Sequence, residues 1–220
     1  MILKLKEKNR LNITILLFVM SVFSLGLSLF RFFLTDSEMF LFLNWNLFLA
    51  FIPWIISTLI IVNAYHKKLN LFFLIIIWLL FFPNSPYILT DLFHLRISSA
   101  APIWYDLIVI LSFAWTGLLF GFLSLMDIEE LLNKYFGRKT IILFIISFLF
   151  LGAFGIYLGR FLRWNSWDII SNPFGLFNDI SDRIFNPLSH PRTWGVTILM
   201  GTLLNMMYFT LKFMKPAKIS

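Results

Sequence analysis

Long apolar runs, separated by short polar segments, constrain this chain more than any other feature. Several runs approach the roughly 20 residues that an α-helix needs to cross a bilayer. Only 13% of the residues are charged, about half the share of an ordinary soluble domain. The runs are continuously apolar instead of alternating with a period of two, which argues against a transmembrane barrel. The sequence therefore predicts an all-α, polytopic transmembrane helix bundle.

Six runs are long enough to count as membrane spans within a single membrane domain, residues 1–220. The first run follows a basic segment, as in a signal peptide, but it is too long and no small-residue cleavage site follows it, so we expect a retained span. The predicted spans are 13–34, 41–62, 69–95 with a break at 83–86, 103–126, 140–161 and 194–213.

The lysines and arginines are unevenly divided between the two ends of these spans. Twelve of the 18 fall on one side: Lys4, Lys6, Lys8, Arg10, Lys67, Lys68, Lys134, Arg138, Lys139, Lys212, Lys215 and Lys218. The other side carries Arg31, Arg96, Arg160, Arg163, Arg183 and Arg192. Because the side richer in basic residues is cytoplasmic, both termini are predicted to be cytoplasmic. Basic residues in this pattern orient spans, so no nucleic acid partner is expected.

The third span is interrupted after about 14 residues by Pro83 and Pro86. Each proline removes a backbone donor, and Asn84, Ser85 and Thr90 are placed to satisfy the freed carbonyl groups. A helix that restarts after Pro86 carries Asp91 and His94, which are three residues apart and share a face.

Two interpretations of this break stay open. One is a kinked helix end in which Asp91 caps the backbone and His94 lies at the lipid headgroups. The other is a discontinuous helix whose broken turn lines a functional site, with Asp91 and His94 as candidate acid and base. Asn44 and Asn46 on the second span are placed to add hydrogen bonds to this region, or simply to mark the membrane interface.

Asp106 opens the fourth span in the motif WYD. We expect it to form a structural ion pair with Arg96, Arg160 or Arg163, with a catalytic role as the alternative. Farther along this span, Gly117 and Gly121 are four residues apart, a spacing that allows close approach of a neighbouring helix.

The fifth span ends in a polar motif, GRFLRWNSWD, at residues 159–168. Arg160 and Arg163 are three apart and are predicted to share a helical face, where they could hold a phosphate or carboxylate. The alternative is that they neutralise Asp91, Asp106 and Asp168. The candidate anion-binding residues are Asn84, Arg160, Arg163, Asn165 and Asp168.

The segment between the fifth and sixth spans predicts a short amphipathic helix at the membrane interface. Asn172 and Pro173 are typical of a helix start, and Phe177, Ile180 and Ile184 then fall on one face. Such a helix could cover the polar residues or serve only for packing.

Residues with metal-ligating side chains are present, but without the spacing of a metal site. Asp91, His94, Asp106 and His190 form no tight ligand motif, so no metal is predicted. The absence of cysteine excludes disulfides and a thiol nucleophile. The sequence assigns no cofactor and no oligomeric state.

Three stretches of the chain resemble a known family. They are PNSPYILTDLFHL at 83–95, WYD at 104–106 and GRFLRWNSWD at 159–168. They resemble a family of bacterial integral membrane proteins, domain-of-unknown-function family 1361, which often has alanine where this chain has Ser85. The resemblance covers most of the chain from the second span onward. It implies a multispan protein of the bacterial cell membrane and supplies no activity.

Three functions are compatible with these observations. The leading hypothesis is an outward-facing polar site that binds or moves a small or lipid-linked anionic ligand. The second is a membrane-embedded enzyme acting on a lipid or lipid-linked substrate, so enzymatic activity is left open. The third is a structural membrane subunit. All three have the lipid bilayer as a partner.

Overall fold

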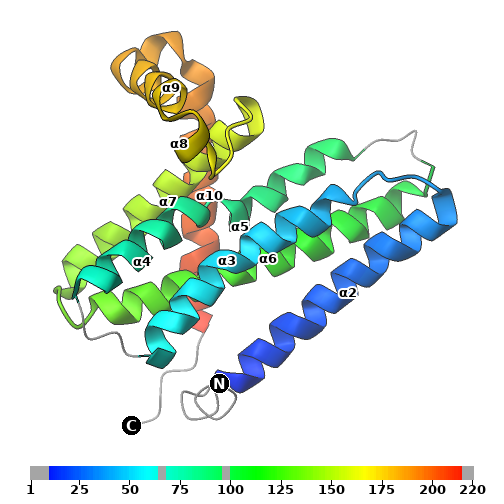
Figure 1. The fold of residues 1–220 in the computed structure, drawn as a ribbon, viewed down its shortest axis with the longest axis horizontal. Coiled ribbons are helices and arrows are strands. Elements are labelled where there is room, and N and C mark those ends of the chain that lie inside the picture. The colour runs from blue at the N-terminus through cyan, green and yellow to red at the C-terminus, as the bar shows by residue number, and fades with distance from the viewer. Residues whose placement is uncertain (1–9, 64–67, 96–99, 215–220) are drawn as a thin grey trace. The chain divides into compact units, whose positions relative to one another are not determined.

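The computed structural model describes residues 10–63, 68–95 and 100–214, and the regular structure in these ranges is helical. Six helical segments there are long and apolar enough to cross a membrane, which confirms the predicted six-span, all-α bundle. They are Leu11–Thr35, Phe42–Val62, Asn70–His94, Ile103–Leu132, Arg138–Phe161 and Pro191–Met214. The chain divides into two compact units, Met1–Lys134 and Tyr135–Ser220, and each is taken by itself below (Figure 1). A single membrane domain stays a prediction.

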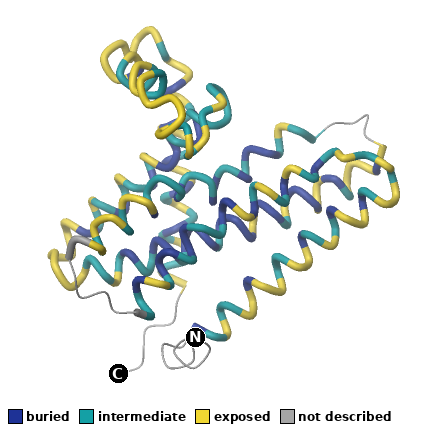
Figure 2. The backbone as a smooth tube through the Cα atoms, viewed as in Figure 1, coloured by how far each residue is buried: buried dark blue, intermediate teal, exposed yellow. Residues whose placement is uncertain are grey.

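The first unit is organised around its longest helix, α6. Its helices are α2 (Leu11–Thr35), α3 (Phe42–Asn63), α4 (Lys68–Phe81), α5 (Asn84–Tyr87), η1 (Ile88–His94) and α6 (Ile103–Leu132). Four of these elements, α2, α3, α5 and η1, pack against α6. Figure 2 shows the buried residues concentrated along α3 and α6, whereas much of α2 is exposed. In a bilayer, that exposed apolar surface would face lipid.

Helix α2 contributes unusual residues to the core. Its buried positions are Leu17, Ser24, Ser28 and Arg31, so only one of the four is a large apolar side chain. Ser24 lies 3.5 Å from Thr116 of α6, hydroxyl oxygen to hydroxyl oxygen. Small polar residues let membrane helices approach closely, because lipid is as apolar as a leucine side chain and gives helices little reason to associate. Polar contacts therefore matter for holding α2 to the unit.

The Pro83–Pro86 break is a real interruption of the helix. Helix α4 ends at Phe81, α5 forms a single turn, and η1 continues as a 3₁₀-helix. The Asn84 side-chain amide donates to the carbonyl of Phe81 at 2.9 Å, and the Thr90 hydroxyl donates to the carbonyl of Tyr87 at 2.7 Å. Two of the three predicted side chains, Asn84 and Thr90, thus bond to backbone carbonyl groups close to the prolines.

Ser85, at the centre of the break, is wedged between α3 and α6. Its hydroxyl donates to the carbonyl of Ala50 in α3 at 2.9 Å. A Cβ atom at Gly117 would lie 2.8 Å from the Ser85 carbonyl oxygen, and one at Gly121 would lie 2.8 Å from the Ser85 Cβ. Only glycine leaves room at these two positions, which confirms the close approach predicted from their spacing.

The second unit is a helical hairpin with smaller helices at one end. Its elements are α7 (Arg138–Phe161), α8 (Asp168–Ser171), α9 (Pro173–Phe185), η2 (Pro187–Ser189) and α10 (Pro191–Met214). The two long helices, α7 and α10, pack along each other. Helix α9 begins where Asn172 and Pro173 predicted it, because the Asn172 side chain accepts the backbone N–H of Gly175 at 3.1 Å. Its place at a membrane interface stays a prediction.

Candidate functional site

Asp91 belongs to a small polar group in the first unit, together with Asn46 and His94. Its carboxylate is buried and accepts a hydrogen bond from the side-chain amide of Asn46 in α3, at 3.0 Å. His94 follows one 3₁₀ turn later, with Nδ1 3.7 Å from the Asp91 carboxylate and the side chain 38% exposed. The imidazole also lies against Phe42, with ring centroids 5.1 Å apart. A buried carboxylate thus sits behind a half-exposed imidazole, an arrangement that can support proton transfer.

Asp106 forms a fully buried ion pair with Arg31 of α2. Arg31 Nε donates to Oδ1 at 2.6 Å and Nη2 donates to Oδ2 at 3.3 Å, and neither side chain is exposed. A third bond runs from Arg31 Nη1 to the carbonyl of Met39, and the Phe40 ring lies 4.8 Å from the guanidinium carbon. This closed geometry favours the structural interpretation of Asp106 over the catalytic one.

The partner in this pair differs from those expected. The sequence predicts Arg96, Arg160 or Arg163 as the partner, whereas the structure gives Arg31, which is 75 residues from Asp106 along the chain. Arg96 lies outside the described residues. Arg31 lies in the last part of α2, and nothing in the local sequence indicates which other span α2 contacts.

Arg160 and Arg163 do not share a helical face, so that prediction is wrong. Helix α7 ends at Phe161, which leaves Arg160 in its last turn, partly buried, and Arg163 beyond it, exposed. Arg163 takes a left-handed backbone conformation with φ of 62°, and the N–H of Trp164 donates back to the carbonyl of Leu158 at 3.1 Å. The chain reverses at Arg163, and the helical spacing ends with it.

Asn165 and Asp168 are bonded to each other in the turn that precedes α8. The Asp168 carboxylate accepts the backbone N–H of Asn165 at 2.7 Å and the hydroxyl of Ser171 at 2.8 Å. These bonds, the backbone one first, lower the pKa of Asp168, because they favour its ionised form. Asp168 thereby stabilises a local turn at the start of α8.

The candidate anion-binding residues are therefore divided between the two units. Asn84 belongs to the first unit, where its amide bonds to the backbone of the break. The other four candidates, Arg160, Arg163, Asn165 and Asp168, belong to the second unit. Their role in binding stays a prediction.

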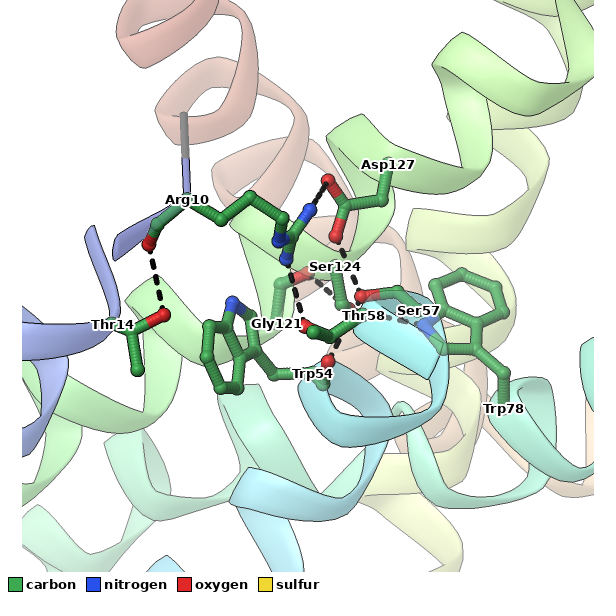
Figure 3. A network of polar contacts seen from close by, with 9 residues as sticks. All are labelled: Arg10, Thr14, Trp54, Ser57, Thr58, Trp78, Gly121, Ser124 and Asp127. Atoms are coloured by element: carbon green, nitrogen blue, oxygen red, sulfur yellow. Dashed lines mark hydrogen bonds and ion pairs between the residues drawn. The ribbon is translucent and has the colours of Figure 1, made fainter. Parts of the chain in front are cut away.

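The structure contains a second ion pair, between Arg10 and Asp127, that is not among the sequence predictions. Arg10, just before α2, donates from Nη1 to Asp127 of α6 at 2.5 Å and from Nη2 to Thr58 of α3 at 2.9 Å (Figure 3). The other oxygen of Asp127 accepts the Ser57 hydroxyl at 2.6 Å. The guanidinium also lies 5.5 Å from the centre of the Trp54 ring. This group joins three helices at one end of the first unit.

The spacing of the charges contained a signal for both ion pairs. Arg10 and Arg31 are 21 residues apart in sequence, and so are Asp106 and Asp127. At 1.5 Å per residue this is about 32 Å, close to the thickness of the hydrocarbon core. Two antiparallel spans with matching intervals of opposite charge can pair at both ends, as α2 and α6 do.

Of the metal-ligand candidates, Asp91 and His94 lie in contact, whereas Asp106 pairs with Arg31. Within the described ranges, no group of three or more histidine, aspartate or glutamate side chains could hold a metal ion. His190 instead lies 2.6 Å from Asp182, whose other oxygen accepts the side-chain amide of Asn186 at 2.7 Å. Those two contacts, the Asn186 bond first, lower the pKa of Asp182.

A comparison with known protein families gives one match. The model of a family described as "Protein of unknown function (DUF1361)" matches residues 45–207, well over half of the chain, which confirms the resemblance drawn from the three motifs. No curated protein and no solved structure gives a significant match.

Proposed function

Because the chain belongs to the DUF1361 family of proteins of unknown function, we propose its function from its own geometry: it binds a small or lipid-linked anionic ligand at the end of α7. The protein is a multi-pass protein of the bacterial cytoplasmic membrane, with both termini cytoplasmic and this end facing outward. The charge distribution between the spans supports that orientation.

The single observation that carries the proposal is the conformation of Arg163. The residue with a left-handed backbone at a helix end is usually glycine and sometimes asparagine, and most other residues there cost about 1–3 kcal/mol. Arg163 nevertheless occupies this position and is exposed. Strain of this kind is typical of positions where a side chain serves a function.

The surroundings of Arg163 also favour an anion. Arg160 lies in the preceding turn, and the guanidinium of Arg192 lies 4.2 Å from the centre of the intervening Phe161 ring. Three arginines therefore gather at this end of the second unit. Asp168 accepts hydrogen bonds from Asn165 and Ser171, and Asp179 accepts hydrogen bonds from Trp164 and Arg183. Arginine side chains so placed suit phosphate or carboxylate oxygens.

The substitution Arg163→Gly tests this proposal because it separates stability from binding. Glycine relieves the left-handed strain, so we expect the protein to gain about 1 kcal/mol in stability. Binding of a dialkyl phosphate lipid in nanodiscs, or of free pyrophosphate, should weaken about tenfold, measured by native mass spectrometry, because a charge-assisted hydrogen bond is lost.

The matched control is Arg138→Gln, which removes an exposed arginine at the other end of the same helix. It should leave binding unchanged. Equal binding by wild type and Arg163→Gly would contradict the proposal. Whether the wild type binds the phosphate lipid or free pyrophosphate would distinguish a lipid-linked ligand from a free one.

The orientation has its own test, because the chain has no cysteine. A cysteine introduced at Ser189 should react with an impermeant thiol reagent added to intact cells, whereas one at Gly137 should react only after lysis. The reverse pattern would place the arginines in the cytoplasm.

A second candidate function rests on the Asp91–His94 contact. A carboxylate held by Asn46 beside a half-exposed imidazole fits a general acid or base acting on a lipid or lipid-linked substrate. Lipid mass spectrometry of membranes that overproduce wild type or His94→Gln should then show a difference in headgroup composition. Identical lipid profiles would argue for the third possibility, a structural subunit.

A further inference from the structure

Helix α9 has its apolar side turned outward. Phe174, Phe177 and Phe185 are 82%, 67% and 80% exposed, and Ile184 is also exposed. At 3.6 residues per turn these four side chains occupy one side of the helix. In a water-soluble protein, this side of an amphipathic helix would face the core.

The polar side of α9 faces the protein instead. The indole N–H of Trp164 donates to the carboxylate of Asp179 at 2.7 Å. Arg183 is buried and donates to the same carboxylate at 3.0 Å, while its carbonyl accepts the indole N–H of Trp194 at 3.1 Å. Because Trp164 follows α7 and Trp194 lies in α10, these bonds fasten the polar side of α9 to both long helices.

The elements next to α9 also expose large apolar side chains. Ile170 in α8 is exposed, and Leu188 in η2 is 95% exposed. Figure 1 shows α9 nearly end-on, at one end of a hairpin whose helix α7 runs across the page. A helix that crosses the direction of the spans at their end has the orientation of one lying in the membrane plane.

We propose that the apolar side of α9, together with Ile170 and Leu188, inserts into the lipid leaflet that meets this end of the second unit. The occupant of the surface is lipid because both flanking long helices are apolar enough to cross the bilayer, and α10 begins only six residues after α9 ends. Such helices bury their apolar side about 5–10 Å into the boundary between headgroups and acyl chains.

The charges on α9 indicate what kind of lipid contact this is. The helix carries Asp179, Asp182 and Arg183, with no lysine and no further arginine, so it lacks the basic face that attracts anionic lipids. Insertion therefore depends on apolar burial and requires no anionic lipid. This surface is independent of the anion site proposed above and does not rest on it.

Spin labels on single cysteines test the proposal in the full-length protein. A label at Phe177→Cys, in nanodiscs of phosphatidylcholine alone, should collide more with oxygen than with a water-soluble nickel complex, at about 5–10 Å below the phosphates. The result should be the same when phosphatidylglycerol is added. Leu199→Cys on the exposed side of α10 is the lipid reference, and Gly137→Cys is the aqueous reference.

Two outcomes would overturn the proposal. Nickel accessibility equal to that at Gly137→Cys would place α9 in water. Shielding from both reagents would mean that a second copy or another protein covers the surface. Asp182→Cys, on the polar side of the same helix, is the matched control and should be less exposed to oxygen than Phe177→Cys. Phe174→Cys repeats the test at a second exposed position.

Discussion

Two arginine–aspartate pairs join α2 to α6, one near each end of α2. They differ in how completely the protein shields them from solvent. Arg31 and Asp106 are both 0% exposed, with two bonds between them and a third to a backbone carbonyl. Arg10 and Asp127 are 11% and 13% exposed and share one bond, with the remaining contacts going to Ser57 and Thr58. Among the described residues, Arg10 Nε has no hydrogen-bond partner.

This difference in burial predicts which pair contributes more to the stability of the fold. A buried charge without its partner is strongly destabilising, because neither water nor another dipole replaces the lost interaction. A pair that is partly open can be rescued by water or lipid headgroups. We therefore expect α2 to depend on the Arg31 pair for its attachment and to be looser at the Arg10 pair.

The largest effect is expected from Asp106→Ala. It leaves the Arg31 guanidinium buried without a carboxylate, which should cost about 3–5 kcal/mol of unfolding free energy. Unfolding of the purified protein by sodium dodecyl sulfate, followed by tryptophan fluorescence, measures this loss. Glu38→Ala removes an exposed carboxylate nearby and should change stability by less than about 0.5 kcal/mol. A loss below about 1 kcal/mol for Asp106→Ala would contradict a closed pair.

The same change at the other end, Asp127→Ala, should cost about 2 kcal/mol, because Arg10 can recover part of its solvation. The measurement is the same detergent titration, with Glu130→Ala as the exposed control on α6. Equal losses for Asp127→Ala and Asp106→Ala would remove the difference between the two pairs.

A smaller effect is expected from Ser57→Ala, which deletes the hydroxyl that supports Asp127. We expect a cost of about 1 kcal/mol, the usual value of one such bond. A double-mutant cycle with Asp127→Ala isolates the interaction, since Ser57→Ala should cost less once the carboxylate is absent. If Ser57→Ala costs the same unfolding free energy in the Asp127→Ala background, the stabilisation by the Ser57 hydroxyl does not depend on Asp127.

The smallest effect is expected when both charges of the closed pair are replaced together. Arg31→Met with Asp106→Leu removes two desolvated ions at once, and such replacements are often neutral or stabilising, with a change within about 1 kcal/mol in this case. Unfolding in detergent measures the change. A loss as large as that of Asp106→Ala would mean that the charges do more than join α2 to α6.

The elements that sequence predicted well are those decided by local chemistry. Lipid leaves backbone groups no external partner, so a long apolar run must be a helix, and all six spans follow from that. Asn172 and Pro173 start α9 because a side-chain acceptor and a fixed φ act within one turn. The bonds of Asn84 and Thr90 at the break also join residues only three apart.

The features that the sequence predicts poorly depend on where a helix ends or on which helices pack together. The shared face of Arg160 and Arg163 failed because α7 stops at Phe161 and no glycine marks the left-handed residue beyond it. The Arg10–Asp127 pair is not predicted because its two residues belong to segments far apart in the sequence. Residues separated by 117 positions leave no local pattern in the sequence. The only indication of the pair is the equal 21-residue spacing of the two arginines and of the two aspartates.

From the sequence alone, this protein is recognisable as a six-span helical membrane protein broken at Pro83 and Pro86, because the bilayer admits few alternatives. Tertiary structure decided that Arg31 meets Asp106, that Ser85 fits against Gly117 and Gly121, and that α9 turns its phenylalanines outward. Each of these depends on the packing of segments distant in sequence. Composition and spacing limit such packing, but the fit of side chains between helices selects it.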